Sequence, residues 1–235
     1  MSIVLRYLPR YLADHLLTRG VAMLVVGAVM ALPILLATGG SQADGEVLHT
    51  LLVQVVGNVS VFLTLIATAG VIGTDLRNGY YRFLLCKPFS PVAYYGAAFG
   101  ATLLSFLTVV LVFTGLFAVV RDPVWPGLRP FASWSITFLL LGGLVFACSR
   151  FTRLDWLVAV AAFILGDVAR NRWPAGESVL GGVLNILLPP SGRSSYFADS
   201  GAALWGPIAW ALGYAAVMIA LGLLAVRYAP PGEHR

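Results

Sequence analysis

The residues best suited to chemistry gather in one stretch, 73–95, which lies between two long apolar runs. Asp75 can accept hydrogen bonds from the free N–H groups at the start of a helix and complement the positive end of the helix dipole. Lys87 falls at the opposite end, where positive charge is favourable, and Pro88 then stops the helix. The spacing therefore predicts a short helix over about 75–87.

This short helix has an apolar surface that a loop facing only water would not need. Its bulky apolar side chains are Tyr80, Tyr81, Phe83, Leu84 and Leu85. Ser90 then caps the next helix, and Pro91 takes the first helical position, where a missing N–H is tolerated. The chain is therefore expected to present a rigid, partly apolar helix clamped between two long helices. Such an element suits the transmission of force from a soluble partner.

The chain lacks the residue patterns of common catalytic sites. Its histidines are His15, His49 and His234, and none lies well inside an apolar run, as the base of an intramembrane hydrolase would. No Gly-x-Ser-Gly sequence occurs, and no Gly-x-x-x-x-Gly-Lys-Ser/Thr loop is present to cradle the phosphates of ATP. Cys86 and Cys148 have no metal-ligand spacing. We therefore predict no catalytic residue, no metal site and no ATP hydrolysis by this chain alone.

Polar side chains inside the apolar runs form a second group of candidates. Thr50, Gln54 and Asn58 recur every four residues and so share one helix face. Such groups in a membrane either bond neighbouring helices or line a cavity, and both interpretations stay open. Asp167 is an acid within an apolar run, three residues from Arg170. It is expected either to form an ion pair with Arg170 at the membrane surface or to act in substrate passage or proton movement.

The composition indicates that lipid, rather than water, surrounds most of the chain. Hydrophobic residues make up 59% and charged residues 11%, with a mean hydropathy of +0.88. Soluble domains carry about 25% charged residues. Five runs contain no charged residue and are long enough for a helix to cross a bilayer, which takes about 20 residues. These runs are Gly20–Ala43, Leu48–Thr74, Pro88–Val120, Pro130–Ser149 and Gly201–Val226.

A sixth, shorter span follows Asp155, so the sequence predicts an all-α integral membrane protein with six transmembrane helices in a single domain, 1–235. The spans are expected at about 21–39, 48–73, 92–120, 131–149, 155–170 and 203–226.

Two further elements flank these spans. The periodicity of leucines and arginines over 3–19 predicts an amphipathic helix in the membrane interface, or else an extension of the first span. The apolar segment 178–188 is too short to cross and ends at a Pro-Pro pair, so it is expected to be a re-entrant or interfacial outer element before the last span.

The distribution of positive charge orients the chain. Ten of the fifteen Lys and Arg residues fall in segments that are cytoplasmic if both termini are inside. Positive residues concentrate on the cytoplasmic side of membrane proteins, so this orientation is preferred. The excess of basic over acidic residues, which gives a pI near 9.5, is thereby explained without a nucleic acid partner.

The segment between the second and third spans resembles the type-2 ATP-binding-cassette (ABC) exporter permeases. The shared pattern is an acid, a Gly four residues on, an Arg, a Leu pair, Lys-Pro and Ser-Pro. Its members here are Asp75, Gly79, Arg82, Leu84, Leu85, Lys87, Pro88, Ser90 and Pro91. The resemblance extends through the N-terminal helix, the six spans and the element before the last span. The family's acid is usually Glu, and Cys86 stands where a small or polar residue is more usual.

In that family this stretch is a coupling helix that docks into a groove on the ATPase subunit. The resemblance therefore implies that residues of 75–91, Tyr80 and Phe83 among them, contact two copies of a separate ABC ATPase, which bind ATP and Mg. It also implies a second permease protomer, expected to be an identical copy, that completes the translocation path. The chain itself is expected to bind no cofactor. A prokaryotic plasma membrane is the expected location.

Two other functions stay open. An ion-coupled secondary carrier is motivated by Asp167 and would respond to a proton gradient rather than to ATP depletion. A non-transporting membrane anchor for an ATPase would share the coupling segment without a path. The transported substrate does not follow from the sequence.

Overall fold

The computed structural model of the protein is helical throughout the part of the chain that it describes, with short turns and no β-strand among those residues. The described residues are 2–37, 59–77, 90–120, 128–149, 151–152, 154–173, 179–188 and 205–228. The helices are α1 (Ser2–His15), a π-helical turn η1 (Leu16–Gly20), α2 (Val21–Ala37), α4 (Val71–Arg77), α6 (Pro91–Val120), α7 (Leu128–Cys148), α8 (Asp155–Arg172), α9 (Val179–Leu187) and α11 (Trp205–Tyr228). Residues 59–68 form a further helix immediately before α4.

Three helices in the described part of the chain are long and apolar enough to cross a membrane. They are Leu8–Met30, Pro91–Gly115 and Ile208–Tyr228. Three shorter apolar helices are Val59–Gly73, Trp134–Cys148 and Asp155–Gly166. An all-helical membrane protein is compatible with these lengths. The count of six spans, the re-entrant element and the orientation stay predictions.

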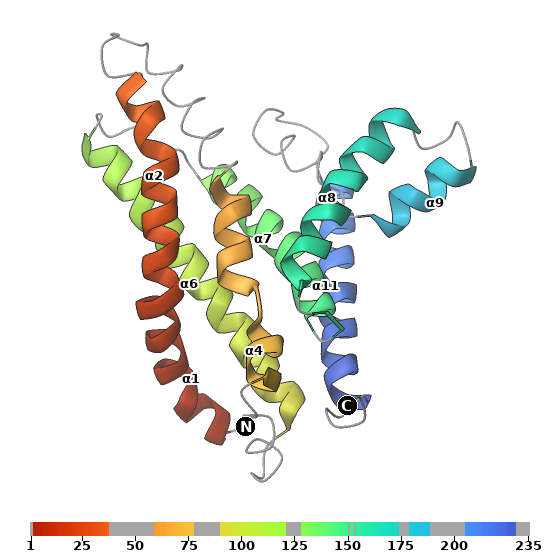
Figure 1. Cartoon of the computed structure of the whole chain (residues 1–235), viewed down its shortest axis with the longest axis horizontal. Helices are drawn as coiled ribbons and strands as arrows, with labels where there is room; N and C mark the ends of the chain where they lie inside the picture. Colours follow the sequence, from red (N-terminus) through yellow and green to blue (C-terminus); the bar gives the residue numbers. More distant parts are fainter. Residues whose placement is uncertain are drawn as a thin grey trace.

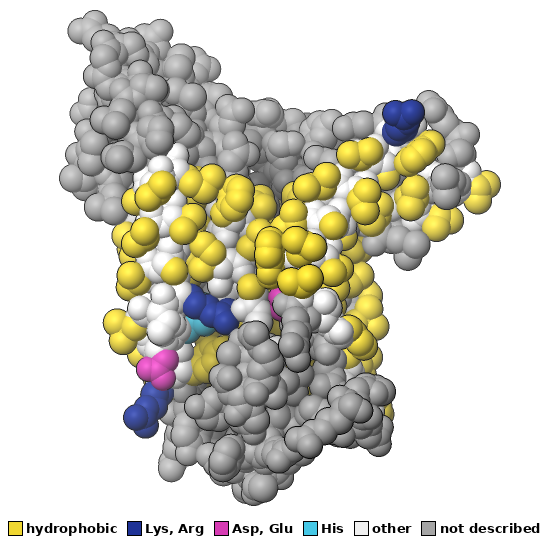
Figure 2. All heavy atoms as spheres, viewed as in Figure 1, with side chains coloured by type: hydrophobic (Ala, Val, Ile, Leu, Met, Phe, Trp, Pro, Cys, Tyr) yellow, Lys and Arg dark blue, Asp and Glu magenta, His cyan; other side chains and the backbone are white. Residues whose placement is uncertain are grey.

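The helices pack as a bundle around α6 and α7 (Figure 1). The main buried cluster joins residues of α6, the helix 59–73 and α7, with α1 and α2 covering one side of α6. On the other side of the bundle, α11 lies along α7 and α8 leans across it, and α9 extends outward. Apolar side chains also cover the outer surfaces of α2 and α8 (Figure 2), which lipid can solvate where water would not.

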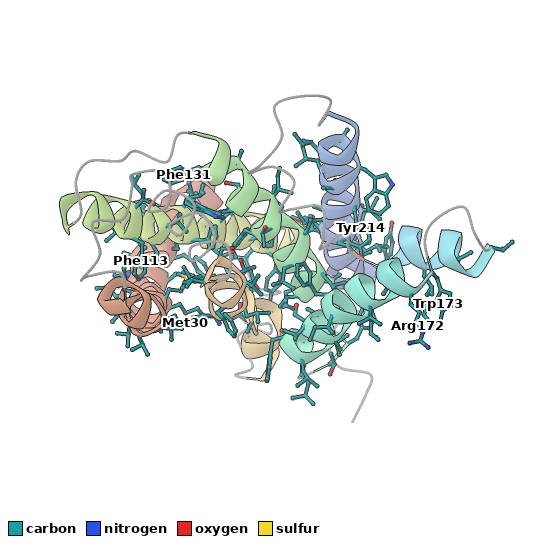
Figure 3. All side chains as sticks on the ribbon, turned by 90° about the horizontal axis from the view of Figure 1, so that it is seen from above. Met30, Phe113, Phe131, Arg172, Trp173 and Tyr214 are labelled. Atoms are coloured by element: carbon teal, nitrogen blue, oxygen red, sulfur yellow. The ribbon has the colours of Figure 1, made fainter. Side chains whose placement is uncertain are left out.

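Glycines set the closest helix contacts in this bundle. A Cβ added at Gly142 of α7 would lie 3.0 Å from Thr68 Cγ2, and one at Gly143 would lie 3.4 Å from the Ala215 carbonyl of α11. Small residues let membrane helices approach in this way. Gly27 likewise makes room on α2 for the ring of Phe113, which Figure 3 shows beside α2.

The N-terminal region is one continuous helix, as the alternative of an extended first span would have it, and not two separate helices. The backbone stays helical without a break from Ser2 to Ala37, and the π-helical turn joins α1 to α2. The apolar span Leu8–Met30 therefore begins within the segment predicted as interfacial. Tyr11 and His15 are the physical reason that α1 stays with the bundle, because they pack onto α6 and the helix 59–73. A position of α1 in the membrane interface stays a prediction.

The helix boundaries elsewhere lie near the predicted ones. Pro91 is the first residue of α6, and the Ser90 carbonyl accepts from the Tyr94 N–H at 3.1 Å, as expected for a cap followed by proline. The helix start predicted at Asp75 differs from the observed one. The helix α4 begins at Val71, after a turn at Ala69 and Gly70 that interrupts the helical backbone.

Candidate functional site

A break in the helix that is described from residue 59 onward lies at the centre of the candidate site. Gly70 has a φ of 68°, in the region that glycine adopts at least cost. In an unbroken helix the Gly70 N–H and the Ala67 carbonyl would be bonded within the helix. At this break both groups are bonded by side chains from other helices, as buried backbone groups require.

The Ala67 carbonyl is bonded from the N-terminal side of the chain. Arg19 donates to it at 2.8 Å and His15 Nε2 at 3.1 Å. Because a carbonyl only accepts, Nε2 carries a proton. His15 Nδ1 lies 3.0 Å from the Ser105 hydroxyl of α6, and both residues are buried. The Ala67 carbonyl therefore connects the α1–η1 segment to the helix 59–68. His15 also connects both to α6 through Ser105.

The Gly70 N–H is bonded from α8. It donates to Asp155 Oδ2 at 2.9 Å, and Asp155 Oδ1 accepts from the Trp156 N–H at 2.9 Å. Asp155 is only 3% exposed. It is the first residue of α8, where the free N–H groups and the helix dipole favour a carboxylate. The same carboxylate therefore stabilises the start of α8 and bonds the free N–H on the other side of the break.

Asp75 lies on α4 just beyond the break. It is inside this helix rather than before its first turn, so the expected capping role does not describe its position. Gly70 marks the start of α4 instead, because the positive φ there ends the preceding helix. The carboxylate of Asp75 accepts from the Tyr94 hydroxyl of α6 at 3.5 Å. Asp75 and Tyr94 thus join the two helices on either side of segment 78–89.

Aromatic rings and one cation surround Asp75. Tyr11 meets Tyr94 edge to face at 6.4 Å between centroids and stacks on His15 at 6.1 Å. Burial raises the pKa of Asp75, while the hydroxyls of Tyr94 and Tyr95 and the charge of Arg19 act in the opposite direction. The protonated form of Asp75 is therefore more accessible here than it would be in water.

Arg19 connects the two halves of the cluster. The acids Asp155 and Asp75, on two different helices, both interact favourably with its charge. Arg19 is only partly buried. Figure 2 shows dark blue and cyan atoms next to each other in a gap of the yellow apolar surface. We call Arg19, His15, Gly70, Asp155, Asp75 and Tyr94 the junction cluster.

The structure describes only part of the predicted sites. Asp75, Ser90 and Pro91 lie in described segments at the two ends of the coupling stretch. Asp167 lies in α8, and its side chain is outside the described residues. The other predicted positions are outside them too: Gly79, Tyr80, Arg82, Phe83, Leu84, Leu85, Lys87, Pro88, Thr50, Gln54 and Asn58.

Sequence reasoning missed most of the junction cluster. The sequence pattern gives no sign that His15, Asp155 and Gly70 come together in one site. One signal was available: Asp155 and Arg19 are charges at the ends of predicted spans, where a partner on a neighbouring helix is to be expected. Nothing in the sequence indicates that these two charges serve the same helix break.

The cluster has neither the ligands of a metal centre nor those of a phosphate-binding loop. Among the described residues, no group of three or more His, Cys, Asp and Glu side chains is placed to hold a metal ion. A movement of one helix can be passed to another through the cluster, because each contact joins a different pair of helices. Comparison of the chain with models of protein families, with curated protein sequences and with solved structures gave no match.

Proposed function

We propose that this chain is the membrane-spanning subunit of an ATP-driven exporter, and that a separate ATPase drives it through the 75–91 segment. The observation that carries the proposal is the contact between Asp75 and Tyr94. It ties α4 to α6 at the base of the segment. A push on the segment would therefore act on both helices together instead of being absorbed by a loose loop.

The junction cluster extends this argument from two helices to four. Asp155 bonds the start of α4 to α8, and Arg19 and His15 bond the preceding helix to the N-terminal segment. A displacement of α4 would reach α1 and α8 through hydrogen bonds of 2.8–3.1 Å. A plain connecting loop between membrane spans would have no use for such buried polar contacts, which are costly to keep unpaired.

The length of α8 supports the short span predicted at 155–170, which is the fifth in chain order. It has 18 residues, which corresponds to about 27 Å of helix, close to the thickness of a bilayer core. Exposed tryptophans lie at its two ends, Trp156 and Trp173. Figure 3 shows Trp173 and Arg172 pointing away from the bundle at one end. Tryptophans favour both membrane surfaces, so these two positions support α8 as a proposed span.

In this proposal Tyr80, Phe83 and Leu84 form the surface that contacts the ATPase. Two ATPase subunits supply ATP and Mg, and two copies of this chain form the path. The polar stripe of Thr50, Gln54 and Asn58 and the acid Asp167 are the proposed path residues. The membrane is proposed to be a prokaryotic plasma membrane, with both termini in the cytoplasm.

The proposal is tested by tagging this subunit, extracting it gently from its native membranes and measuring ATP hydrolysis in the purified complex. We expect an ATPase to co-purify. Changing Tyr80, Phe83 and Leu84 to Ser should release or uncouple it. Phe151→Ser is the matched control, because Phe151 is 77% exposed in a turn between α7 and α8, outside the segment.

Two results would contradict the proposal: no ATPase with the wild-type chain, or full coupled activity in the triple variant. Transport that stops on collapse of the proton gradient but survives ATP depletion would instead favour the carrier based on Asp167. An ATPase that co-purifies without any transport in reconstituted vesicles would indicate a membrane anchor.

A further inference from the structure

At the helix break at Ala69 and Gly70, side chains from other helices bond two backbone groups. A straight helix would bond the same two groups within its own backbone. In a straight helix the Gly70 N–H would donate to the Ile66 carbonyl, and the Val71 N–H would donate to the Ala67 carbonyl. In the observed arrangement Asp155 takes the Gly70 N–H, and Arg19 and His15 take the Ala67 carbonyl. The Gly70 N–H and the Ala67 carbonyl thus have partners in either form.

The side chains released by straightening would also find partners. Arg19 and Asp155 are side chains of opposite charge that bond the two backbone groups on either side of the break. If the helix reclaimed its backbone groups, Arg19 would lose the Ala67 carbonyl, and Asp155 would lose the Gly70 N–H and keep the Trp156 N–H. The released cation and anion would then lie in a poorly solvated site. Such a pair gains by contact. His15 would keep the Ser105 hydroxyl as its partner.

We propose that the break is a hinge with two hydrogen-bonded states. In the bent state, which this structure shows, the hydrogen bonds of Arg19, His15 and Asp155 to the backbone stabilise the break. In the straight state the helix 59–68 continues into α4, and Arg19 pairs with Asp155. Elements with two discrete arrangements are the ones that switch in conformational changes. The hinge belongs to the chain itself and does not depend on which energy source drives it.

Glycine at position 70 supports a hinge rather than a fixed kink. Proline is the residue that bends a helix permanently, because its ring removes a hydrogen bond in every conformation. Glycine permits the positive φ of the bent state and also permits the helical conformation of the straight state. The two alternatives therefore stay close in free energy at this residue.

The test measures the distance between α4 and the α7–α8 turn in the purified full-length chain. Spin labels are attached to Arg77→Cys and Phe151→Cys in a background that carries Cys86→Ser and Cys148→Ser. Electron paramagnetic resonance then gives the distance distribution. The wild-type hinge should give a main distance for the bent state, with a minor second distance for the straight one.

Two substitutions at one position separate the hinge from a simple steric effect. Gly70→Ala adds a Cβ that disfavours positive φ, and Gly70→Asn adds a side chain that tolerates it. Gly70→Ala should raise the ratio of straight to bent on the order of five- to thirtyfold, and Gly70→Asn should change it far less. Gly100→Ala, in open space on α6, should leave the distribution unchanged.

The inference is overturned if Gly70→Ala keeps the wild-type distribution, or if Gly70→Ala and Gly70→Asn shift it equally. It is also overturned if the straight distance is absent from the wild type and from every hinge variant that elutes as a folded species in gel filtration. None of these readouts involves ATP, so failure of the hinge and failure of the exporter proposal can be told apart.

Discussion

Two regions of this bundle are held together by opposite means. Where α7 meets α11, glycines allow close packing, and Gly222 approaches the ring of the fully buried Phe146. Where α1, α4, α6 and α8 meet, the junction cluster uses a few directional hydrogen bonds between charged or polar groups and backbone. Close packing has one solution, whereas hydrogen bonds can be exchanged for others. The comparison indicates that α7 and α11 form the rigid part and that the junction is the part suited to movement.

The largest effect should come from overfilling the close-packed region. A Cβ at Gly222 would lie 2.6 Å from the Phe146 ring and 3.2 Å from the Phe146 carbonyl. Gly222→Val should therefore lower the free energy of unfolding by about 1–3 kcal/mol, because the buried ring has little room to shift. Unfolding in mixed micelles measures this change. Gly213→Val, on the same helix in open space, is the control, and equal losses in both variants would contradict the packing argument.

An intermediate effect should come from removing one side chain of the junction cluster. His15→Ala deletes the bonds to Ser105 and to the Ala67 carbonyl, of which the carbonyl keeps Arg19 as a partner. The buried Ser105 hydroxyl loses its imidazole partner, so we expect a loss of about 1 kcal/mol in the same unfolding assay. Thr18→Ala serves as control, since Thr18 is exposed and bonds only within its own helix segment. A His15 variant as stable as the control would show that the junction contributes nothing to stability.

The smallest effect concerns pH and Asp75. Burial raises its pKa in the folded chain, so the folded state holds the proton more tightly than the unfolded state does. Its contribution to stability is therefore present below the ordinary Asp pKa and is lost as pH rises through the raised value. In Asp75→Asn this pH dependence should disappear. Unfolding midpoints compared from acidic to neutral pH measure it, and parallel curves for the two chains would be the contrary result.

The sequence predicted the helical fold well because long apolar runs leave few alternatives. The helix expected at about 92–120 corresponds to α6, which begins at Pro91, the predicted first helical position. Such boundaries follow from charge, proline and chain length, which are local properties. The same reasoning placed the end of the second span near Gly73, whereas the helix breaks at Gly70.

The junction cluster was beyond sequence reasoning because it depends on contacts between distant residues. Asp155 follows Gly70 by 85 positions, and Ser105 follows His15 by 90. A glycine within an apolar run is common in membrane helices and indicates no break by itself. Only the packing of α8 beside the helix 59–73 brings a carboxylate to the Gly70 N–H. The predicted segment itself, 78–89, lies outside the described residues, so its coupling role stays a prediction.

The central claim is that segment 75–91 contacts an ATPase, and photo-crosslinking in native membranes tests it most directly. A photoreactive amino acid replaces Tyr80 in one chain and Phe151 in a second, and the crosslinked products are identified by mass spectrometry. We predict that position 80 captures a polypeptide with a Gly-x-x-x-x-Gly-Lys-Ser/Thr loop and that position 151 does not. If position 80 captures only lipid, or no ATPase, the segment does not receive a power stroke and the exporter assignment is wrong.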